Sequence, residues 1–179
     1  MEKTDKTLIR IAIVGPESTG KTTLAEELAA HYNTAFVPEY ARAYIDRLNR
    51  PYTIDDILAI SKGQVALEDE RAKLANKLLI CDTNLLVTKI WAEHAYNYCP
   101  EWIVETIKTR TYHIYLLTYP DTPWVADEQR EHPHLREFLF EKYKNELEKQ
   151  AVAYSVITGL GKLRLDGAID IINKALKAS

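Results

Sequence analysis

The chain has 179 residues, of which 46% are hydrophobic and 27% charged, and its formal net charge is −3. This length suits one domain with a sizeable core, and the composition is typical of a globular protein. A slightly acidic chain without a basic stripe argues against a nucleic-acid partner, because binding a phosphate backbone needs a concentrated Lys/Arg surface.

Targeting and redox signals are equally sparse. No apolar run approaches the roughly 18 residues of a membrane span, and the polar start at residues 1–6 is not that of a signal peptide. Two cysteines, Cys81 and Cys99, cannot build a disulfide framework. We therefore expect a cytoplasmic protein with reduced thiols and no membrane partner. The sequence gives no indication of oligomeric state.

Five short apolar segments alternate with longer segments of helical periodicity along the chain. The predicted strands are residues 8–14, 34–38, 77–81, 113–118 and 154–158. The predicted helices follow residue 23, run from Thr53 to about residue 76, follow residue 82, begin at Pro100, and span about 135–150 and 166–176. Near-continuous apolar strands between helices predict an α/β fold, a three-layer α/β/α domain with a five-stranded parallel sheet.

The first strand runs directly into residues 15–22, which match the phosphate-binding pattern G-x-x-x-x-G-K-[ST] at every fixed position. Such a loop converges backbone N–H groups on phosphate oxygens, and the helix that follows aims its positive end at them. The sequence therefore predicts ATP and Mg²⁺ as cofactors. The expected nucleotide-binding residues are Gly15, Glu17, Ser18, Thr19, Gly20, Lys21, Thr22 and Thr23.

Three of the polar residues receive specific roles. Lys21 is expected to contact the β- and γ-phosphates, and the Thr22 hydroxyl to ligate Mg²⁺. Asp82 ends the third apolar segment, at the edge of a parallel sheet where ligands bind. It could hold Mg²⁺, accept the proton of an attacking hydroxyl, or cap the next helix, and more than one of these roles is possible.

Segments elsewhere in the chain indicate which kind of protein carries this phosphate-binding loop, or P-loop. The chain has no guanine-reading N-K-x-D segment, and it is short for an ATP-driven machine. Residues 119–136 lack clear periodicity and contain three prolines, which suggests a lid that closes over transferring phosphate. Arg130 and Arg136 in this lid could stabilise the charge of the γ-phosphoryl group. We therefore predict a single kinase domain over residues 1–179.

Four motifs occur in an order and spacing that resembles a known family. They are Gly15–Thr22, Pro38-Glu39-Tyr40-Ala41-Arg42, Cys81-Asp82-Thr83-Asn84, and Pro123-Trp124-Val125-Ala126-Asp127 with Arg130. Together they resemble the ribosylnicotinamide kinase domain of NadR-type NAD-biosynthesis proteins, over nearly the whole chain. Two positions depart from the family pattern: Asn84 stands where an acid is typical, and Glu128 where glycine is frequent.

The resemblance implies that ATP phosphorylates the 5′-hydroxyl of nicotinamide riboside, giving nicotinamide mononucleotide. It also implies a kinase without the DNA-binding and adenylyltransferase domains of the larger members. An acceptor with a pyridinium cation and ribose hydroxyls calls for aromatic faces and carboxylates. The expected acceptor-binding residues are Glu39, Tyr40, Arg42, Asn84, Trp91, Trp124 and Asp127.

Two other functions remain open at this stage. The acceptor could be another nucleoside, nucleotide or small metabolite; a monophosphate would need arginines near the second strand, where Arg42, Arg47 and Arg50 occur. Alternatively, the domain could be a regulatory module that binds ATP without transferring phosphate. Nicotinic acid riboside as an additional acceptor is likewise open.

Overall fold

The computed structural model describes residues 7–178 and contains one five-stranded sheet. The strands are β1 (Ile9–Val14), β2 (Phe36–Val37), β3 (Leu78–Asp82), β4 (Ile114–Thr118) and β5 (Tyr154–Ile157). They pair in parallel in the order β2-β3-β1-β4-β5, with β1 in the centre. The predicted fold class, an α/β domain with a five-stranded parallel sheet, is confirmed.

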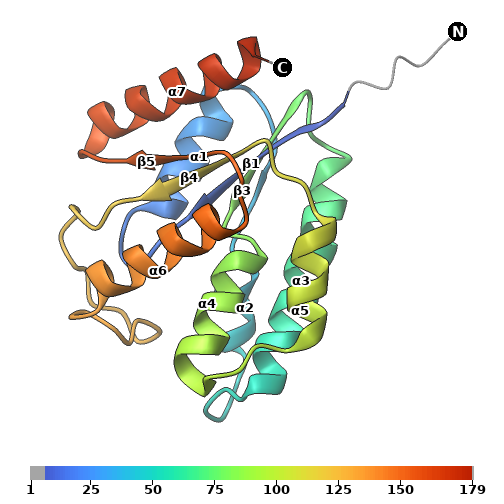
Figure 1. Cartoon of the computed structure of the whole chain (residues 1–179), viewed down its shortest axis with the longest axis vertical. Helices are drawn as coiled ribbons and strands as arrows, with labels where there is room; N and C mark the ends of the chain where they lie inside the picture. The colour runs from blue at the N-terminus through green and yellow to red at the C-terminus, as the bar shows by residue number, and fades with distance from the viewer. Residues whose placement is uncertain (1–6, 179) are drawn as a thin grey trace, which may run out of the picture.

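Seven helices occur within the described residues (Figure 1). They are α1 (Lys21–His31), α2 (Tyr40–Asp46), α3 (Ile54–Ala72), α4 (Leu85–Tyr96), α5 (Glu101–Thr109), α6 (Arg136–Lys149) and α7 (Gly161–Lys177). A capping box starts α3 at the predicted position: Thr53 and Asp56 exchange side-chain and backbone hydrogen bonds. Helix α2 was not predicted, and α7 begins five residues earlier than expected.

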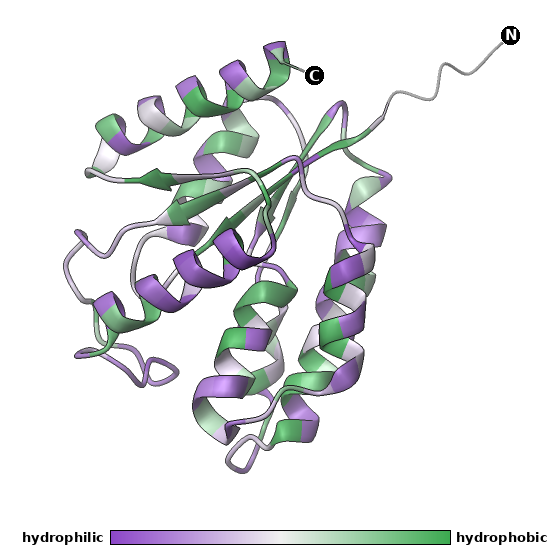
Figure 2. Ribbon diagram, in the orientation of Figure 1, coloured by the Kyte–Doolittle hydropathy of each residue, from purple (hydrophilic) through white to green (hydrophobic). Residues whose placement is uncertain are grey.

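The alternation of side chains along β1 builds two cores on opposite faces of the sheet. Ile9, Ile11 and Ile13 pack against α1 and α7, whereas Ala12 and Val14 pack against α4 and α6. Because the central strands are buried on both faces, their sequences are apolar at almost every position. Figure 2 shows this as mostly hydrophobic colouring of the strands and banded colouring of the helices. Helix α5 packs outside this sandwich, against α3 and α4.

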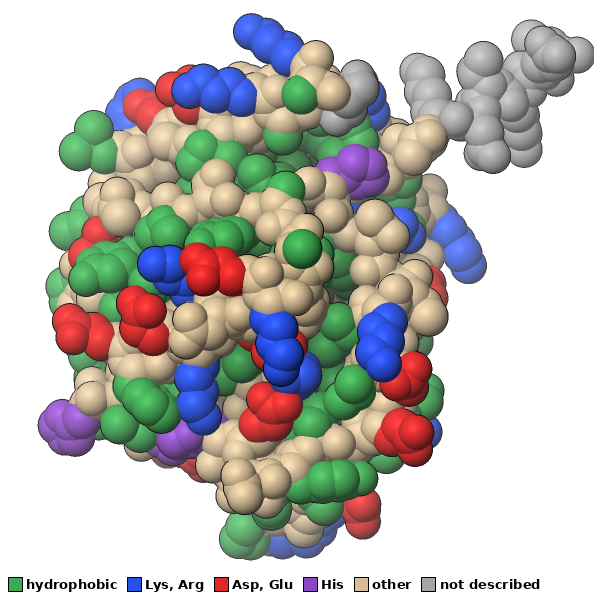
Figure 3. All heavy atoms as spheres, viewed as in Figure 1, with side chains coloured by type: hydrophobic (Ala, Val, Ile, Leu, Met, Phe, Trp, Pro, Cys, Tyr) green, Lys and Arg blue, Asp and Glu red, His purple; other side chains and the backbone are tan. Residues whose placement is uncertain are grey.

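The surface carries charges of both signs. On the face in Figure 3, Lys and Arg side chains are interspersed with Asp and Glu rather than gathered into one patch. Within residues 7–178, no helix is both long enough and apolar enough to cross a bilayer.

Helix α2 rests on α3 through a close contact between Tyr40 and Gly63. A Cβ atom added at Gly63 would overlap the Tyr40 ring. We expect Gly63→Ala to lower the free energy of unfolding by about 1–3 kcal/mol, since overpacking outweighs the better helix propensity of alanine. Urea unfolding would measure this loss.

Gly167 in α7 provides the matched control, because a Cβ there meets no described atom within 4 Å. Gly167→Ala should raise the free energy of unfolding by up to about 1 kcal/mol. Equal stability of the two variants would contradict the proposed α2–α3 contact.

Candidate active site

The loop between β1 and α1 is shaped by two glycines and two threonines. Gly15 (φ 147°) lies so close to Thr118 at the end of β4 that a Cβ atom would collide with it. Gly20 (φ 77°) turns the chain into α1 in a left-handed conformation. Inside the loop, the buried Thr19 hydroxyl is 2.7 Å from the Pro16 carbonyl and 2.6 Å from the Thr118 hydroxyl. Residues 15–20 are therefore held as a curved loop above the N-terminus of α1.

The Lys21 side chain folds back over this loop. Its ammonium group donates to the carbonyl oxygens of Gly15 at 3.0 Å and Pro16 at 2.7 Å. Burial lowers the pKa of Lys21, and the nearby carboxylates of Glu39 and Asp82 oppose that shift. The ammonium thus lies where the loop and the first turn of α1 meet, which is where an anionic group would bind.

Asp82 lies beside Thr22 at the carboxyl end of β3. The Thr22 hydroxyl donates to Asp82 Oδ2 at 2.6 Å, and the register of the sheet pairs Asp82 with Ile13 of β1. Asp82 Oδ1 is buried and has no hydrogen-bond partner among the described residues. Burial raises the pKa of Asp82 to about 6, whereas the hydrogen bond from Thr22 opposes that rise. Two adjacent oxygen ligands with one unsatisfied carboxylate oxygen fit a hard divalent cation such as Mg²⁺.

The helix that follows β3 is capped by Asn84, not by Asp82. The Asn84 side chain accepts a hydrogen bond from Leu86 N at 3.0 Å and donates to the Tyr115 hydroxyl at 3.2 Å. The capping role considered for Asp82 is therefore wrong, because β3 continues through that residue and α4 begins at Leu85. Asn84 is buried in these contacts and does not line the cavity described next.

A cavity of about 370 Å³ extends from the loop toward α2 and α4. All eight predicted nucleotide-binding residues line it, but only three of the seven predicted acceptor-binding residues do. Of the predicted site residues, those in its wall are Gly15, Glu17, Ser18, Thr19, Gly20, Lys21, Thr22, Thr23, Glu39, Arg42, Trp91 and Arg130. Its volume falls in the range of small-molecule sites.

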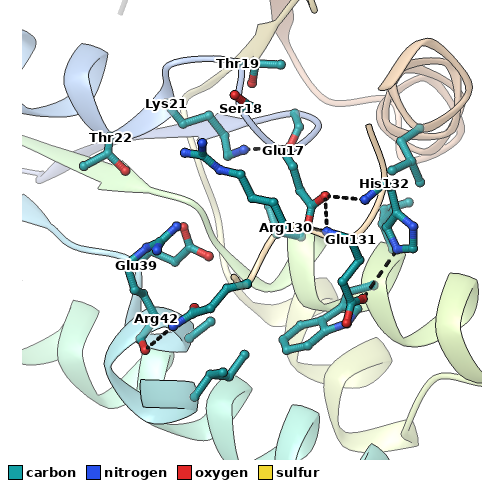
Figure 4. A pocket seen from close by; sticks show the side chains of 18 of the residues that line it. Glu17, Ser18, Thr19, Lys21, Thr22, Glu39, Arg42, Arg130, Glu131 and His132 are labelled. Carbon is teal, nitrogen blue, oxygen red and sulfur yellow. Dashed lines mark hydrogen bonds and ion pairs between the residues drawn. The ribbon is translucent and has the colours of Figure 1, made fainter. Parts of the chain in front are cut away.

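The connecting segment, residues 119–135 between β4 and α6, is bonded to the tip of the loop. The Glu17 carboxylate accepts from the backbone N–H groups of Glu131 at 3.2 Å and His132 at 3.1 Å (Figure 4). Ser18 Oγ accepts from Val125 N at 2.9 Å, and the Ser18 carbonyl accepts from the Thr122 hydroxyl at 2.7 Å. The side chains of Glu17 and Ser18 therefore hold the connecting segment.

The same segment also contacts the opposite wall of the cavity. Arg42 of α2 forms an ion pair with Asp127 at 2.9 Å, and Tyr52 donates to the Glu131 carboxylate at 2.9 Å. Gln129 donates to the Asp46 carboxylate at 2.5 Å. The connecting segment thus bridges the loop and α2, and Asp127 acts through Arg42 without lining the cavity itself.

The two arginines predicted for the lid lie in different environments. Arg130 lines the cavity, and in Figure 4 its side chain extends toward the loop and Lys21. Arg136 instead donates to the carbonyl oxygens of Ser18 at 3.1 Å and Thr122 at 2.7 Å, with its guanidinium over the Trp124 ring. Neither Arg136 nor Trp124 is part of the cavity wall. Arg130 is therefore the lid arginine with direct access to the cavity.

Several aromatic side chains line the cavity away from the P-loop, namely Tyr52, Trp91 and His94. Tyr52 and Trp91 meet edge to face with centroids 4.8 Å apart, and His94 meets His132 at 4.6 Å. Burial lowers the pKa of His94 and raises that of Tyr52 to about 12. Of these four residues, only Trp91 was predicted from the sequence, because Tyr52, His94 and His132 belong to no recognised motif.

The side chains of Glu39 and Tyr40 lie in different places although the two residues are neighbours in the chain. Glu39 precedes α2 and lines the cavity, whereas the Tyr40 ring packs on Gly63 outside it. The Tyr40 backbone N–H donates to Gln64 Oε1 at 2.8 Å, which fixes the start of α2. Of this pair, Glu39 is the residue available to a bound molecule.

This geometry is that of a P-loop protein. A Gly-rich loop between β1 and α1, with Lys21 and Thr22 at the start of α1 and Asp82 at the carboxyl end of β3, forms a P-loop nucleotide-binding site. The family model of an AAA domain matches residues 10–163, so the chain belongs to that family.

Two curated relatives are the trifunctional NAD biosynthesis/regulator proteins NadR of Salmonella typhimurium and Escherichia coli. Each is 31% identical over 123 residues, covering 65% of this chain and 30% of the relative. The chain therefore spans less than a third of the length of these relatives. The predicted likeness to the NadR-type family is confirmed.

Solved structures agree on the fold. A NadR protein in complex with NR superposes with a TM-score of 0.82 at 23% identity, covering 94% of this chain and 51% of that one. A deoxyadenosine kinase from M. mycoides superposes with a TM-score of 0.63 at 16% identity, covering 93% of this chain and 100% of the kinase chain. At these identities the likeness establishes the shared fold.

The raised pKa of Asp82 makes stability depend on pH. A folded-state pKa of about 6 against an ordinary value of 3.8 means that the native state binds the extra proton between about pH 4 and pH 6. Stability from this group is therefore lost as pH rises through that window. We expect the stability of Asp82→Asn relative to the original chain to increase by about 2–3 kcal/mol as the pH rises from 4 to 7.

Urea unfolding at several pH values, without divalent cations, would measure that gain. Asp170→Asn replaces an exposed carboxylate on α7 and serves as the control. A stability difference between Asp82→Asn and the original chain that stays constant from pH 4 to pH 7 would contradict the buried, ionisable Asp82 described here.

Proposed function

We propose that this chain transfers the γ-phosphoryl group of ATP to the 5′-hydroxyl of nicotinamide riboside, yielding nicotinamide mononucleotide and ADP. The observation that carries the proposal is the continuous cavity. It joins a P-loop at one end to an aromatic and acidic chamber between α2 and α4 at the other. The likeness to NadR proteins, one of them solved with NR, supports nicotinamide riboside as the acceptor. We expect the reaction to use ATP as the phosphoryl donor and to take place in the cytoplasm.

The residues at the P-loop end bind and orient the nucleotide. Lys21 exchanges its carbonyl partners for the β- and γ-phosphate oxygens, and Arg130 adds a second positive charge from the connecting segment. Thr22 and Asp82 hold Mg²⁺, which neutralises phosphate charge when bound. The free Oδ1 of Asp82 and its raised pKa support this role, because a cation would compensate the buried carboxylate.

At the acceptor end, charge and shape favour a nucleoside with a cationic ring. The faces of Trp91 and Tyr52 attract a positive ring, and Glu131 adds a carboxylate beside Tyr52. Glu39 lies in the cavity wall with Lys21 and is positioned to accept a hydrogen bond from an acceptor hydroxyl.

The connecting segment acts as a lid over both ends. Its bonds to Glu17 and Ser18 on the P-loop and to Arg42 and Tyr52 across the cavity support this role. A closed lid excludes water, which limits hydrolysis of ATP in place of transfer to the acceptor.

Arg42 and Arg50 argue against a monophosphate acceptor. Both line the cavity, but Arg42 is paired with Asp127 and Arg50 is paired with the buried Asp56 at 2.6 Å. The charge of each arginine is therefore already compensated, so neither offers an uncompensated positive charge to an acceptor phosphate. A neutral or cationic nucleoside needs none.

The substrate assignment can be tested with an acceptor panel. We expect ADP release to be fastest with nicotinamide riboside among nicotinamide riboside, nicotinic acid riboside, adenosine, cytidine and thymidine monophosphate. Lys21→Ala should lower kcat by at least about 100-fold, because it removes a charge that stabilises the transferred phosphoryl group. Lys62→Ala removes an exposed lysine of α3 that lies over the Trp102 ring and outside the cavity wall, and it is the control.

Each outcome separates the candidate functions. Faster turnover of another nucleoside would replace nicotinamide riboside and retain a P-loop kinase. ATP binding without acceptor-dependent ADP release would instead indicate a regulatory module.

The aromatic end of the cavity can be tested through the charge of the acceptor ring. Trp91→Leu keeps apolar bulk but removes the indole face, so kcat/KM for nicotinamide riboside should fall about 5- to 30-fold. The loss should be smaller for benzamide riboside, an uncharged analogue of similar shape. The ratio of the two values is the measurement, because a general loss of stability affects both acceptors alike. Equal losses would mean that Trp91 acts by packing alone.

A further inference from the structure

Arg164 is a buried arginine that no sequence motif indicated. It lies in the first turns of α7 and is 5% exposed, and it is absent from the wall of the cavity. Its guanidinium donates in three directions: Nε to the Gly159 carbonyl at 2.8 Å, Nη2 to the Tyr119 carbonyl at 3.1 Å, and Nη1 to the Thr19 carbonyl. One side chain therefore joins the turn before α7, the end of β4 and the P-loop.

Asp121 fixes the orientation of this guanidinium. Its Oδ1 accepts from Arg164 Nη2 at 2.7 Å, while its Oδ2 accepts from the Gly159 backbone N–H at 2.7 Å. An arginine held by a carboxylate and several carbonyl groups has little rotational freedom, because its planar donors must match every acceptor at once. The contact to Thr19 is thus imposed by a preformed support.

The contact to Thr19 determines the orientation of one peptide group. No peptide bond among the described residues is cis, and in a trans peptide the C=O and N–H point in opposite directions. The Thr19 carbonyl is bound to Arg164, which lies outside the cavity, whereas Gly20 lines the cavity, so a trans peptide directs the Gly20 N–H away from Arg164 and toward the cavity. Gly20 has φ 77° and carries no Cβ, so without a partner for Thr19 the peptide could rotate and turn its carbonyl toward the phosphates.

We propose that Arg164 is a positioning residue that holds the Thr19–Gly20 peptide with its N–H toward the nucleotide phosphates. It acts from behind the loop and touches neither ATP nor the acceptor. The inference rests on the nucleotide-binding half of the proposed function and is independent of which acceptor is used. Its consequence is that a side chain outside the cavity controls phosphate affinity through backbone orientation.

The test compares ligands with and without phosphates. We expect Arg164→Ala to raise the Kd for Mg·ADP, measured by calorimetry, about 10- to 100-fold, the order of one hydrogen bond to a charged group. Binding of adenosine should change by less than about 2-fold. Millimolar guanidinium should restore part of the lost ADP affinity, because it can occupy the vacated site. If Arg164 had a purely structural role, its loss would weaken the binding of ADP and adenosine alike, and guanidinium would not restore ADP affinity selectively.

Arg110→Ala is the matched control. Arg110 is largely buried and paired with Glu68 and Asp69 near the amino ends of the strands, remote from the P-loop. It should lower the melting temperature without changing the Kd for ADP. Unchanged ADP affinity in Arg164→Ala, or equal losses for ADP and adenosine, would overturn the proposal.

A variant that retains charge covers the case in which Arg164→Ala does not fold. Arg164→Lys cannot donate to Thr19, Tyr119 and Gly159 from one ammonium, so its ADP affinity should still fall several-fold. Original ADP affinity in Arg164→Lys would then overturn the proposal. Failure of the original chain to bind ADP at all would instead count against the proposed function.

Discussion

The site depends on the parallel pairing of β1 with β3 on one side and β4 on the other. Because all three strands run in the same direction, their carboxyl ends open on one edge of the sheet. That arrangement brings Gly15, Asp82 and Thr118 together from three distant parts of the chain. The P-loop is then shaped from behind by Thr118, flanked by Asp82 and followed by the N-terminus of α1.

Buried charges fall into two groups with different consequences. Glu68 is 1% exposed but is bonded to Arg110 at 2.9 Å and the Tyr112 hydroxyl at 2.6 Å, so its charge is compensated within the fold. Asp82 is equally buried, yet Oδ1 is left without a partner. A buried carboxylate that is incompletely satisfied costs stability, which marks it as a group poised for a ligand rather than for the core.

The connecting segment carries the coupling between the two ends of the cavity. Its backbone N–H groups bind Glu17 on the P-loop, and its side chains bind Arg42 and Asp46 on α2. Movement of the segment therefore requires breaking contacts on both sides. Arg136 and Trp124, which resemble phosphate- and ring-binding residues in the sequence, stabilise the segment from outside the cavity.

The sheet, the P-loop and the positions of Lys21, Thr22 and Asp82 around it could be predicted from the sequence, because apolar strands and the loop motif are local patterns that the fold preserves. Helix α2 was missed because it is short and has no buried residue within it. The tertiary structure decided that Arg130 rather than Arg136 enters the cavity, that Tyr52 and His94 line it, and that Arg164 contacts the P-loop from outside it. Asn84 caps α4 through a local contact with Leu86, two residues away. The other outcomes depend on contacts between distant residues, such as Arg136 with Thr122 across 14 residues and Arg164 with Thr19 across 145, and no local pattern encodes the direction in which a long side chain points.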